Sequence, residues 1–132
     1  TNLEKAIFEE ANLNSANLSA ANALKAAFKH ANLTNAILIR TQLDWANCTE
    51  ANLINAKLQG ATLFNATMQG ADLAGADLTG ADLREADFEN AHMEGVCLTD
   101  CKVREAIFSG ATGLSAEQKV WLKENKALNV EL

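Results

Sequence analysis

The side chains with the greatest capacity for chemistry in this chain are two histidines and three cysteines. Histidine can act as a general base or a metal ligand, and a cysteine thiolate can act as a nucleophile. Either kind of site needs several such groups close together, but the sequence has no paired C-x-x-C motif and no glycine-rich phosphate loop that opens a helix. We therefore expect no catalytic residues, no cofactor and no metal site at His30, His92, Cys48, Cys97 or Cys101.

The elements that must position these side chains follow a period of five. Written from Thr1, the chain divides without insertion into 22 pentapeptides that end at Gly110. The first place is Ala in 18 of them, and the third place is Leu, Phe, Met, Val or Cys in 21. Neither a helix nor an amphipathic strand has this period. The pattern therefore predicts stacked repeats, each of which buries its apolar places only against its neighbours.

The motif A-(N/D)-L-x-x over residues 1–110 resembles the signature of the pentapeptide-repeat family. The resemblance implies an all-β fold, a right-handed quadrilateral β-solenoid in which four pentapeptides form one 20-residue coil, so 22 repeats make about 5.5 coils. First-place and third-place side chains would point inward and the other three outward. His30 and His92 would then lie on adjacent faces, too far apart to share a site. Cys48 and Cys101 would point inward and Cys97 outward, which argues against a disulfide between the last two.

The phenylalanines support a 20-residue coil independently of the resemblance. Four of the five occupy third places, at Phe8, Phe28, Phe88 and Phe108, and the intervals between them are 20, 60 and 20 residues. All four therefore fall in one interior column. We expect their rings to stack there.

The fifth place of each pentapeptide should lie in a β-turn at a corner of the coil. Gly or Asn is common there from Asn55 onwards, and both residues suit the positive φ of a type II turn. Before that point Lys, Glu, Arg and Trp are common instead. We therefore expect mixed turns, with type I favoured towards the N-terminus.

The repeat fails after Gly110, because Gly113 falls where an apolar residue belongs. Ser115 and Gln118 form a capping-box pattern, so a helix is predicted from there to about Ala127. The predicted organisation is a solenoid over residues 1–113 and a C-terminal helical cap and tail over residues 114–132. The helix is either a lid on the hydrophobic column or a dimerisation element. Its expected apolar members are Val120, Trp121 and Leu128.

The first coil has no equivalent cap, because Thr1 opens directly into a repeat. Its third-place side chains would form the exposed end of the core, in a coil whose backbone groups are unpaired. We expect either preceding residues or a docked partner at this end. The side chains concerned are Leu3, Phe8, Leu13 and Leu18.

The charge distribution separates two functional interpretations. Residues 1–66 carry five basic and five acidic side chains, whereas residues 67–132 carry six basic and twelve acidic ones. Some pentapeptide-repeat proteins resemble double-stranded DNA in shape and charge and bind type II topoisomerases. The family resemblance therefore implies, as one possible function, that this chain mimics DNA. A DNA-like acidic wall would run along the rod, however, and the clearest acidic group encircles one level. The competing interpretation is that these acids form a solvated surface that keeps the rod soluble. This acidic belt consists of Asp72, Asp77, Asp82 and Asp87.

Three large apolar side chains break the polar pattern of the fourth and fifth places. Leu24 and Phe64 belong to one outer column with Asp44 between them, and Trp45 lies at the adjoining corner. An exposed apolar patch with aromatic members is typical of a partner site. Because Ala23 leaves the core of that coil short of volume, the competing interpretation is that Leu24 turns inward through a bulge.

The function predicted from the sequence is a non-enzymatic protein–protein interaction or scaffolding module with a protein partner. The alternative is a DNA-mimicking binder of a type II topoisomerase (gyrase). The net charge of −6 argues against direct nucleic-acid binding, and no long apolar run predicts membrane insertion. An end-to-end or cap-mediated homo-oligomer is also considered. Many relatives occur in cyanobacteria and chloroplasts. We expect a cytoplasmic location, with the thylakoid lumen, the periplasm or a longer membrane-anchored chain as alternatives.

Overall fold

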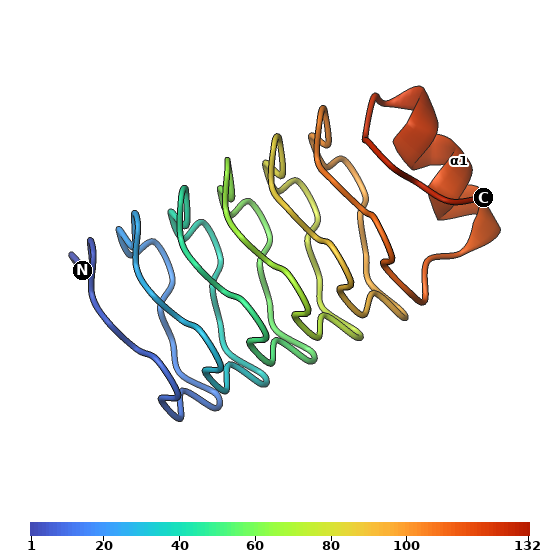
Figure 1. The fold of residues 1–132 in the computed structure, drawn as a ribbon. Coiled ribbons are helices and arrows are strands. Elements are labelled where there is room, and N and C mark those ends of the chain that lie inside the picture. Colours follow the sequence, from blue (N-terminus) through green and yellow to red (C-terminus); the bar gives the residue numbers. More distant parts are fainter.

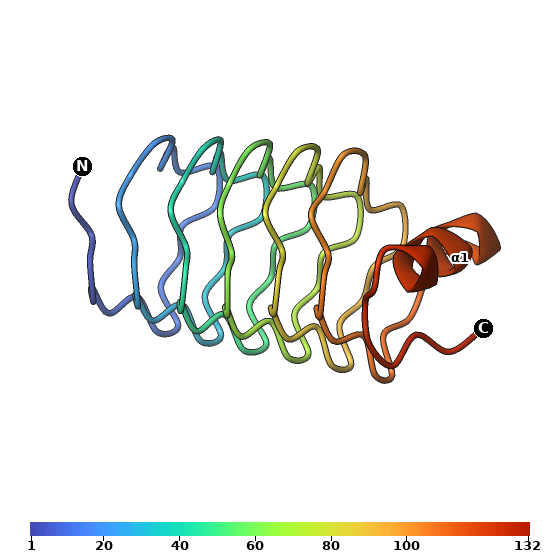
Figure 2. The same ribbon diagram turned by 90° about the horizontal axis from the view of Figure 1, so that it is seen from above.

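The computed structural model describes residues 1–132 as a rod of stacked coils with one helix at its C-terminal end (Figure 1). Parallel β-bridges join second-place residues twenty apart, from Asn2 and Asn22 to His92 and Thr112. A turn follows every five residues. Each coil therefore has four sides, and the view from above shows the coils stacked along one axis with the termini at opposite ends (Figure 2).

Backbone hydrogen bonds between coils hold the stack together. The third-place N–H donates to the second-place carbonyl of the next coil, as from Leu33 to Asn52 at 2.7 Å. The second-place N–H donates backwards to a first-place carbonyl, as from Asn52 to Ala31 at 2.9 Å. Each side of an interior coil thus pairs on both its edges, which satisfies backbone groups that the compact rod would otherwise bury unpaired.

The preference for Asn or Asp at the second place has a local cause. The side-chain Oδ1 accepts the backbone N–H of the fourth residue in the same pentapeptide, at 3.0 Å between Asn52 and Ile54. Asp72 does the same for Ala74 at 3.1 Å. This bond forms an Asx-turn that steers the chain into the corner.

All corners have the same backbone conformation, so the expectation of type I turns near the N-terminus is wrong. Every fifth-place residue has a positive φ, including Lys5 at 59°, Glu10 at 60° and Trp45 at 63°. The fifth-place N–H also donates to the next coil, as from Lys25 to the Asp44 carbonyl at 3.0 Å. Stacking therefore imposes one turn geometry on every coil, at a cost of roughly 1–2 kcal/mol for each residue other than glycine.

The interior consists of columns of third-place side chains, and the phenylalanine column is as predicted. Phe8 and Phe28 stack with ring centroids 5.2 Å apart and planes 12° from parallel. Phe88 and Phe108 stack at 5.1 Å and 4°. Each offset pair contributes about 0.5–1.5 kcal/mol beyond its buried area.

Two exceptions to first-place Ala make the same extra bond inside the core. The Thr41 hydroxyl donates to the Leu18 carbonyl at 2.8 Å, and the Cys101 thiol donates to the Leu78 carbonyl at 2.9 Å. Both acceptors are third-place carbonyls of the preceding coil. The Thr41 hydroxyl and the Cys101 thiol therefore each have a hydrogen-bond partner within the core.

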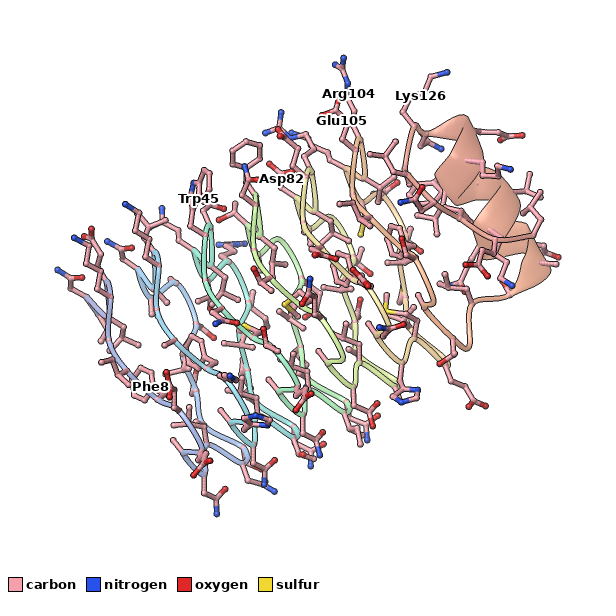
Figure 3. The ribbon with its side chains drawn as sticks, viewed as in Figure 1. Phe8, Trp45, Asp82, Arg104, Glu105 and Lys126 are labelled. Atoms are coloured by element: carbon pink, nitrogen blue, oxygen red, sulfur yellow. The ribbon has the colours of Figure 1, made fainter.

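The N-terminal coil is only partly covered. Its third-place side chains, from Leu3 to Leu18, are half-buried, whereas those of the later coils are buried. Figure 3 shows Phe8 near this end of the rod.

Helix α1 spans Ala116–Glu124, and Ser115 is its N-cap with both capping-box bonds present. It ends three residues before the expected Ala127 because Lys126 has a positive φ of 69°. The N–H groups of Lys126 and Ala127 donate back to the carbonyls of Lys123 and Leu122 at 3.2 and 3.0 Å, which is a Schellman cap. Leu122 is its buried residue, whereas Val120 is 47% exposed. Of the three expected apolar members, Trp121 is half-buried, whereas Val120 and Leu128 are exposed.

The tail after α1 returns to the solenoid. The Leu128 N–H donates to the Ala106 carbonyl at 2.8 Å, and the Leu128 carbonyl accepts the Phe108 N–H at 3.1 Å. Leu122 and Val130 belong to the same continuous core as the coils. The predicted cap and solenoid segments thus share one core. No helix of the structure has the length and apolar character needed to span a bilayer.

Candidate functional site

The histidines occupy separate columns, and each contacts a neighbour twenty residues away. His30 Nδ1 lies 3.2 Å from a Glu50 carboxylate oxygen, with both side chains exposed. His92 Nδ1 lies 2.9 Å from the Thr112 hydroxyl. The structure contains no group of three or more His, Cys, Asp or Glu side chains arranged to hold a metal ion.

The cysteines fall into two environments, with the orientations predicted from the repeat. Cys48 and Cys101 are buried, and burial raises the pKa of each thiol to about 12. Cys97 is partly exposed, and hydrogen bonds from Thr79 and then Thr99 lower the pKa of its thiol. Because the thiolate is the reactive form, only Cys97 combines access with reactivity.

We predict that an aromatic disulfide reagent at neutral pH titrates one thiol in the folded protein and three after denaturation. Cys97→Ser should remove the fast thiol, while Cys48→Ser should leave it unchanged. The reaction should also begin at a lower pH than for an unperturbed cysteine, because a depressed pKa gives more thiolate at a given pH. Fast labelling of two or three thiols in the folded state would show that the core positions are open to solvent.

The acidic belt is built into the turns of a single coil. Each of its four carboxylates accepts the fourth-place N–H of its own pentapeptide, as Asp87 does from Glu89 at 2.9 Å. The Thr79 hydroxyl lowers the pKa of Asp77, and the Arg84 guanidinium lowers that of Asp82. Each aspartate is half-buried and does what Asn does at the same place in other coils. The belt therefore has a structural role that accounts for its position.

The apolar patch centres on two aromatic side chains in contact. Trp45 is 56% exposed and meets Phe64 edge to face, with ring centroids 6.2 Å apart. The Arg84 guanidinium carbon lies 5.7 Å from the Phe64 ring centroid, and Arg84 also forms a two-pronged ion pair with Asp82 at 2.8 and 2.9 Å. We call Trp45, Phe64 and Arg84 the aromatic corner. Arg84 was not among the residues predicted from the sequence, although it follows Phe64 in the same outer column.

Leu24 lies in a regular coil beside this corner. The Leu24 N–H donates to Asn22 Oδ1 at 3.2 Å, and the turn closes from Ala26 to Ala23 at 3.1 Å. Its side chain is half-buried on the outer surface. The structure therefore contains no bulge at Leu24, and the interpretation that it repairs the core at Ala23 is wrong.

Phe64 is held by a contact between coils. In half of the pentapeptides a second-place Asn or Asp side chain caps the fourth-place N–H, but the second place here is Thr62. Asp44, one coil earlier, accepts the Phe64 N–H at 3.0 Å instead. This bond between coils positions the backbone that carries Phe64 in the aromatic corner.

These features define a class: a β-solenoid built from stacked five-residue repeats. The family model described as "Pentapeptide repeats" matches eight copies over residues 1–35, 11–47, 41–80 and 71–110. The chain belongs to the pentapeptide-repeat family, and its fold is a right-handed β-solenoid. A comparison with curated proteins found no match.

Solved structures of this family resemble the chain over most of its length. A pentapeptide repeat protein from the Arabidopsis thaliana thylakoid lumen is 26% identical, with a TM-score of 0.77 over 82% of this chain and 74% of its own. One from Nostoc PCC 7120 is 27% identical, with a TM-score of 0.65 over 76% of this chain and 84% of its own. QnrB1, a plasmid-mediated fluoroquinolone resistance protein, is 22% identical, with a TM-score of 0.52 over 93% and 71%, and shows the fold alone.

Proposed function

We propose that this chain is a non-enzymatic protein-interaction module and that its partner docks at the aromatic corner. One observation carries the proposal: Trp45 is 56% exposed at a fifth place, where φ is 63°. A bulky residue in this conformation costs roughly 1–2 kcal/mol, and this one is not repaid by burial in the core. Large exposed aromatic side chains are characteristic of the energetically dominant residues of interfaces.

The chemistry of the surroundings suits a protein partner. The Trp45 and Phe64 rings offer apolar area, and Arg84 lies beside them as a donor already oriented by Asp82. Trp, Tyr and Arg are enriched among residues that dominate binding energy. Figure 3 shows that Trp45 projects from the same edge of the rod as Arg104, Glu105 and Lys126. A partner lying along this edge would meet an apolar anchor first and a row of charges beyond it.

The DNA-mimicking alternative receives less support from this chain. A topoisomerase that grips duplex DNA reads two lines of phosphates, whereas the acidic belt encircles one coil. In the column of Asp82 the neighbours are Thr62 and Lys102. A basic side chain one coil away from the acid interrupts a DNA-like wall on that face.

Two substitutions in one corner column test the proposal. Lys25→Gly should raise the free energy of unfolding by about 0.5 kcal/mol, because relief of the positive φ outweighs the greater freedom of glycine in the unfolded chain. Trp45→Gly should stay within about 1 kcal/mol of the parent, because the same relief is offset by loss of the Phe64 contact. Denaturant unfolding measures both changes.

Partner capture should separate the same two variants. With each protein immobilised in a lysate of the source cells, Trp45→Gly should lose at least about nine-tenths of the captured partner, which corresponds to a loss of about 1.4 kcal/mol in binding. Lys25→Gly should capture as much as the parent. Equal capture by all three proteins would contradict docking at the aromatic corner, and a large stability loss in Trp45→Gly would show that Trp45 supports the fold.

A further inference from the structure

The C-terminal edge of the solenoid is closed unevenly. On three of its four sides the following chain supplies backbone bonds: Met93 donates to the Thr112 carbonyl at 2.7 Å, Glu105 to Lys126 at 2.8 Å, and Phe108 to Leu128 at 3.1 Å. The fourth side, residues 96–100, receives no backbone hydrogen bond from the chain that follows it, because α1 takes the place of the next pentapeptide in the sequence. This side ends in an open β-edge.

One bond on this side is made by a side chain in place of a backbone group. The Gln118 amide nitrogen donates to the Val96 carbonyl at 2.8 Å, as a second-place N–H would in a further coil. The N–H groups of Leu98 and Asp100 have no hydrogen-bond partner in the structure. Their counterparts one coil earlier, Leu78 and Gly80, donate to the carbonyls of Cys97 and Thr99 at 2.9 and 2.8 Å. Two donors in ladder register are therefore left unpaired.

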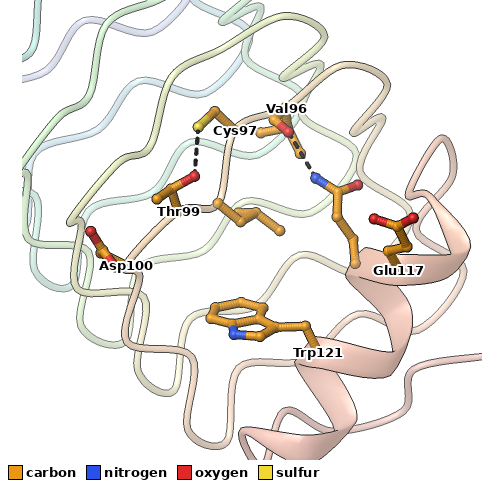
Figure 4. A pocket seen from close by; sticks show the side chains of 8 residues that line it. Val96, Cys97, Thr99, Asp100, Glu117 and Trp121 are labelled. Atoms are coloured by element: carbon orange, nitrogen blue, oxygen red, sulfur yellow. Dashed lines mark hydrogen bonds between the residues drawn. The ribbon is translucent and has the colours of Figure 1, made fainter.

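A groove of about 580 Å³ lies between this edge and α1. Figure 4 shows Trp121 of α1 facing the segment from Val96 to Asp100 across the opening. Its apolar lining includes Leu98 and Trp121, and the volume falls in the range of small-ligand and peptide sites. The charged residues that line it are Asp100 and Glu117, and no basic side chain lines it. The groove is thus apolar within and negative at its rim.

We propose that this groove binds an extended, basic peptide segment of a partner protein, which completes the missing side of the coil by β-augmentation. Two carbonyls of the segment, two residues apart, would accept the Leu98 and Asp100 N–H groups, as in each earlier coil. The residue between them would point inward over Leu98, so it is apolar. Lys or Arg on either side would face Asp100 and Glu117. Main-chain bonds supply affinity in this mode, and the alternate side chains supply specificity.

This site is independent of the aromatic corner. It is formed by residues 96–100 and α1, and no residue is shared with Trp45, Phe64 or Arg84. Its test uses the purified protein and a synthetic probe, so failure of one proposal leaves the other standing. Cys97 lines the groove and gives a second, chemical readout.

The probe is the peptide acetyl-Lys-Thr-Leu-Thr-Lys-amide, titrated into isotope-labelled protein and followed by nuclear magnetic resonance. In the free protein the Leu98 and Asp100 amides should exchange with solvent quickly and those of Leu78 and Gly80 slowly. At millimolar peptide we expect severalfold slower exchange at Leu98 and Asp100 only, together with slower labelling of Cys97. Peptides with Glu in place of both Lys, or Asp in place of the Leu, should bind at least fivefold more weakly.

Matched protein variants localise the effect. Glu117→Lys should weaken probe binding at least fivefold, whereas Glu89→Lys makes the same charge change away from the groove and should leave binding unchanged. Equal binding of all three peptides, or shifts that avoid Leu98 and Asp100, would overturn the proposal. So would protection of these amides that grows with protein concentration without peptide, because a second copy would then be the occupant.

Discussion

Leu73→Asp is expected to unfold the rod at room temperature. Leu73 is fully buried in a third-place column, with leucine or methionine above and below it and no polar partner within the core. Burying an unpaired carboxylate adds a desolvation cost to the lost apolar contacts, so we expect a loss of at least about 4 kcal/mol, comparable to the whole stability of many domains. Circular dichroism during thermal and denaturant unfolding measures it, and Leu53→Asp should behave in the same way.

The matched control lies in the same column at the open end. Leu13 is only half-buried, so Leu13→Asp should cost no more than about 2 kcal/mol and leave a cooperative transition. A cooperative transition in Leu73→Asp near the parental temperature would contradict a dry column. Similar losses in both variants would mean that the first coil is covered in solution.

Gly113→Ala is expected to be the most damaging conservative change. Gly113 has φ of 85°, and an added Cβ would lie 2.5 Å from the Glu94 backbone nitrogen and 2.7 Å from its Cα. Backbone atoms cannot swing aside as a flexible side chain can. Strain from φ and overpacking together should cost about 3 kcal/mol, measured by denaturant unfolding.

Gly80→Ala separates the two terms. Gly80 also has a positive φ, of 70°, but an added Cβ would meet no atom within 4 Å. Its loss should therefore be about 1 kcal/mol, the conformational cost alone. If both variants lost the same free energy of unfolding, the close approach to Glu94 would add no cost. The junction between the solenoid and the helix would then move enough to accommodate the added Cβ.

The sequence predicts the coil well because nearly every pentapeptide has a small residue at its first place and an apolar residue at its third place. A fixed five-residue place for small and apolar side chains determines what lies inside, and the spacing of Phe8 and Phe28 reveals the twenty-residue coil. The turn type was mispredicted from local preference. The fifth-place N–H of Lys25 donates to the next coil, so stacking between coils outweighs the preference of Lys for the negative φ of a type I turn.

The C-terminal segment follows no repeat, and only its start could be predicted. The capping box at Ser115 is a local signal, and the structure contains it. The burial of Leu122 and the pairing of Leu128 with Ala106 depend on how α1 folds back over the last coil, which a short sequence pattern does not encode. The open edge at Leu98 depends on the same geometry.

The candidate surface was predicted in part for the same reason. Trp45 and Phe64 stand out because apolar residues are rare at outward places, and the coil length brings them together. Arg84 looks like any surface charge in the sequence. Only the outer column, in which it follows Phe64 by twenty residues, shows that it completes the corner.

Site-specific photo-crosslinking tests the central claim, docking at the aromatic corner, most directly. A benzophenone amino acid replaces Phe64 in one protein and Ala74, at the fourth place of another side of the same coil, in a second. In source cells the account predicts one discrete crosslinked partner from position 64, none from position 74, and loss of the product when Trp45→Gly is added. Equal products from both positions, or a product that persists with Trp45→Gly, would contradict the account.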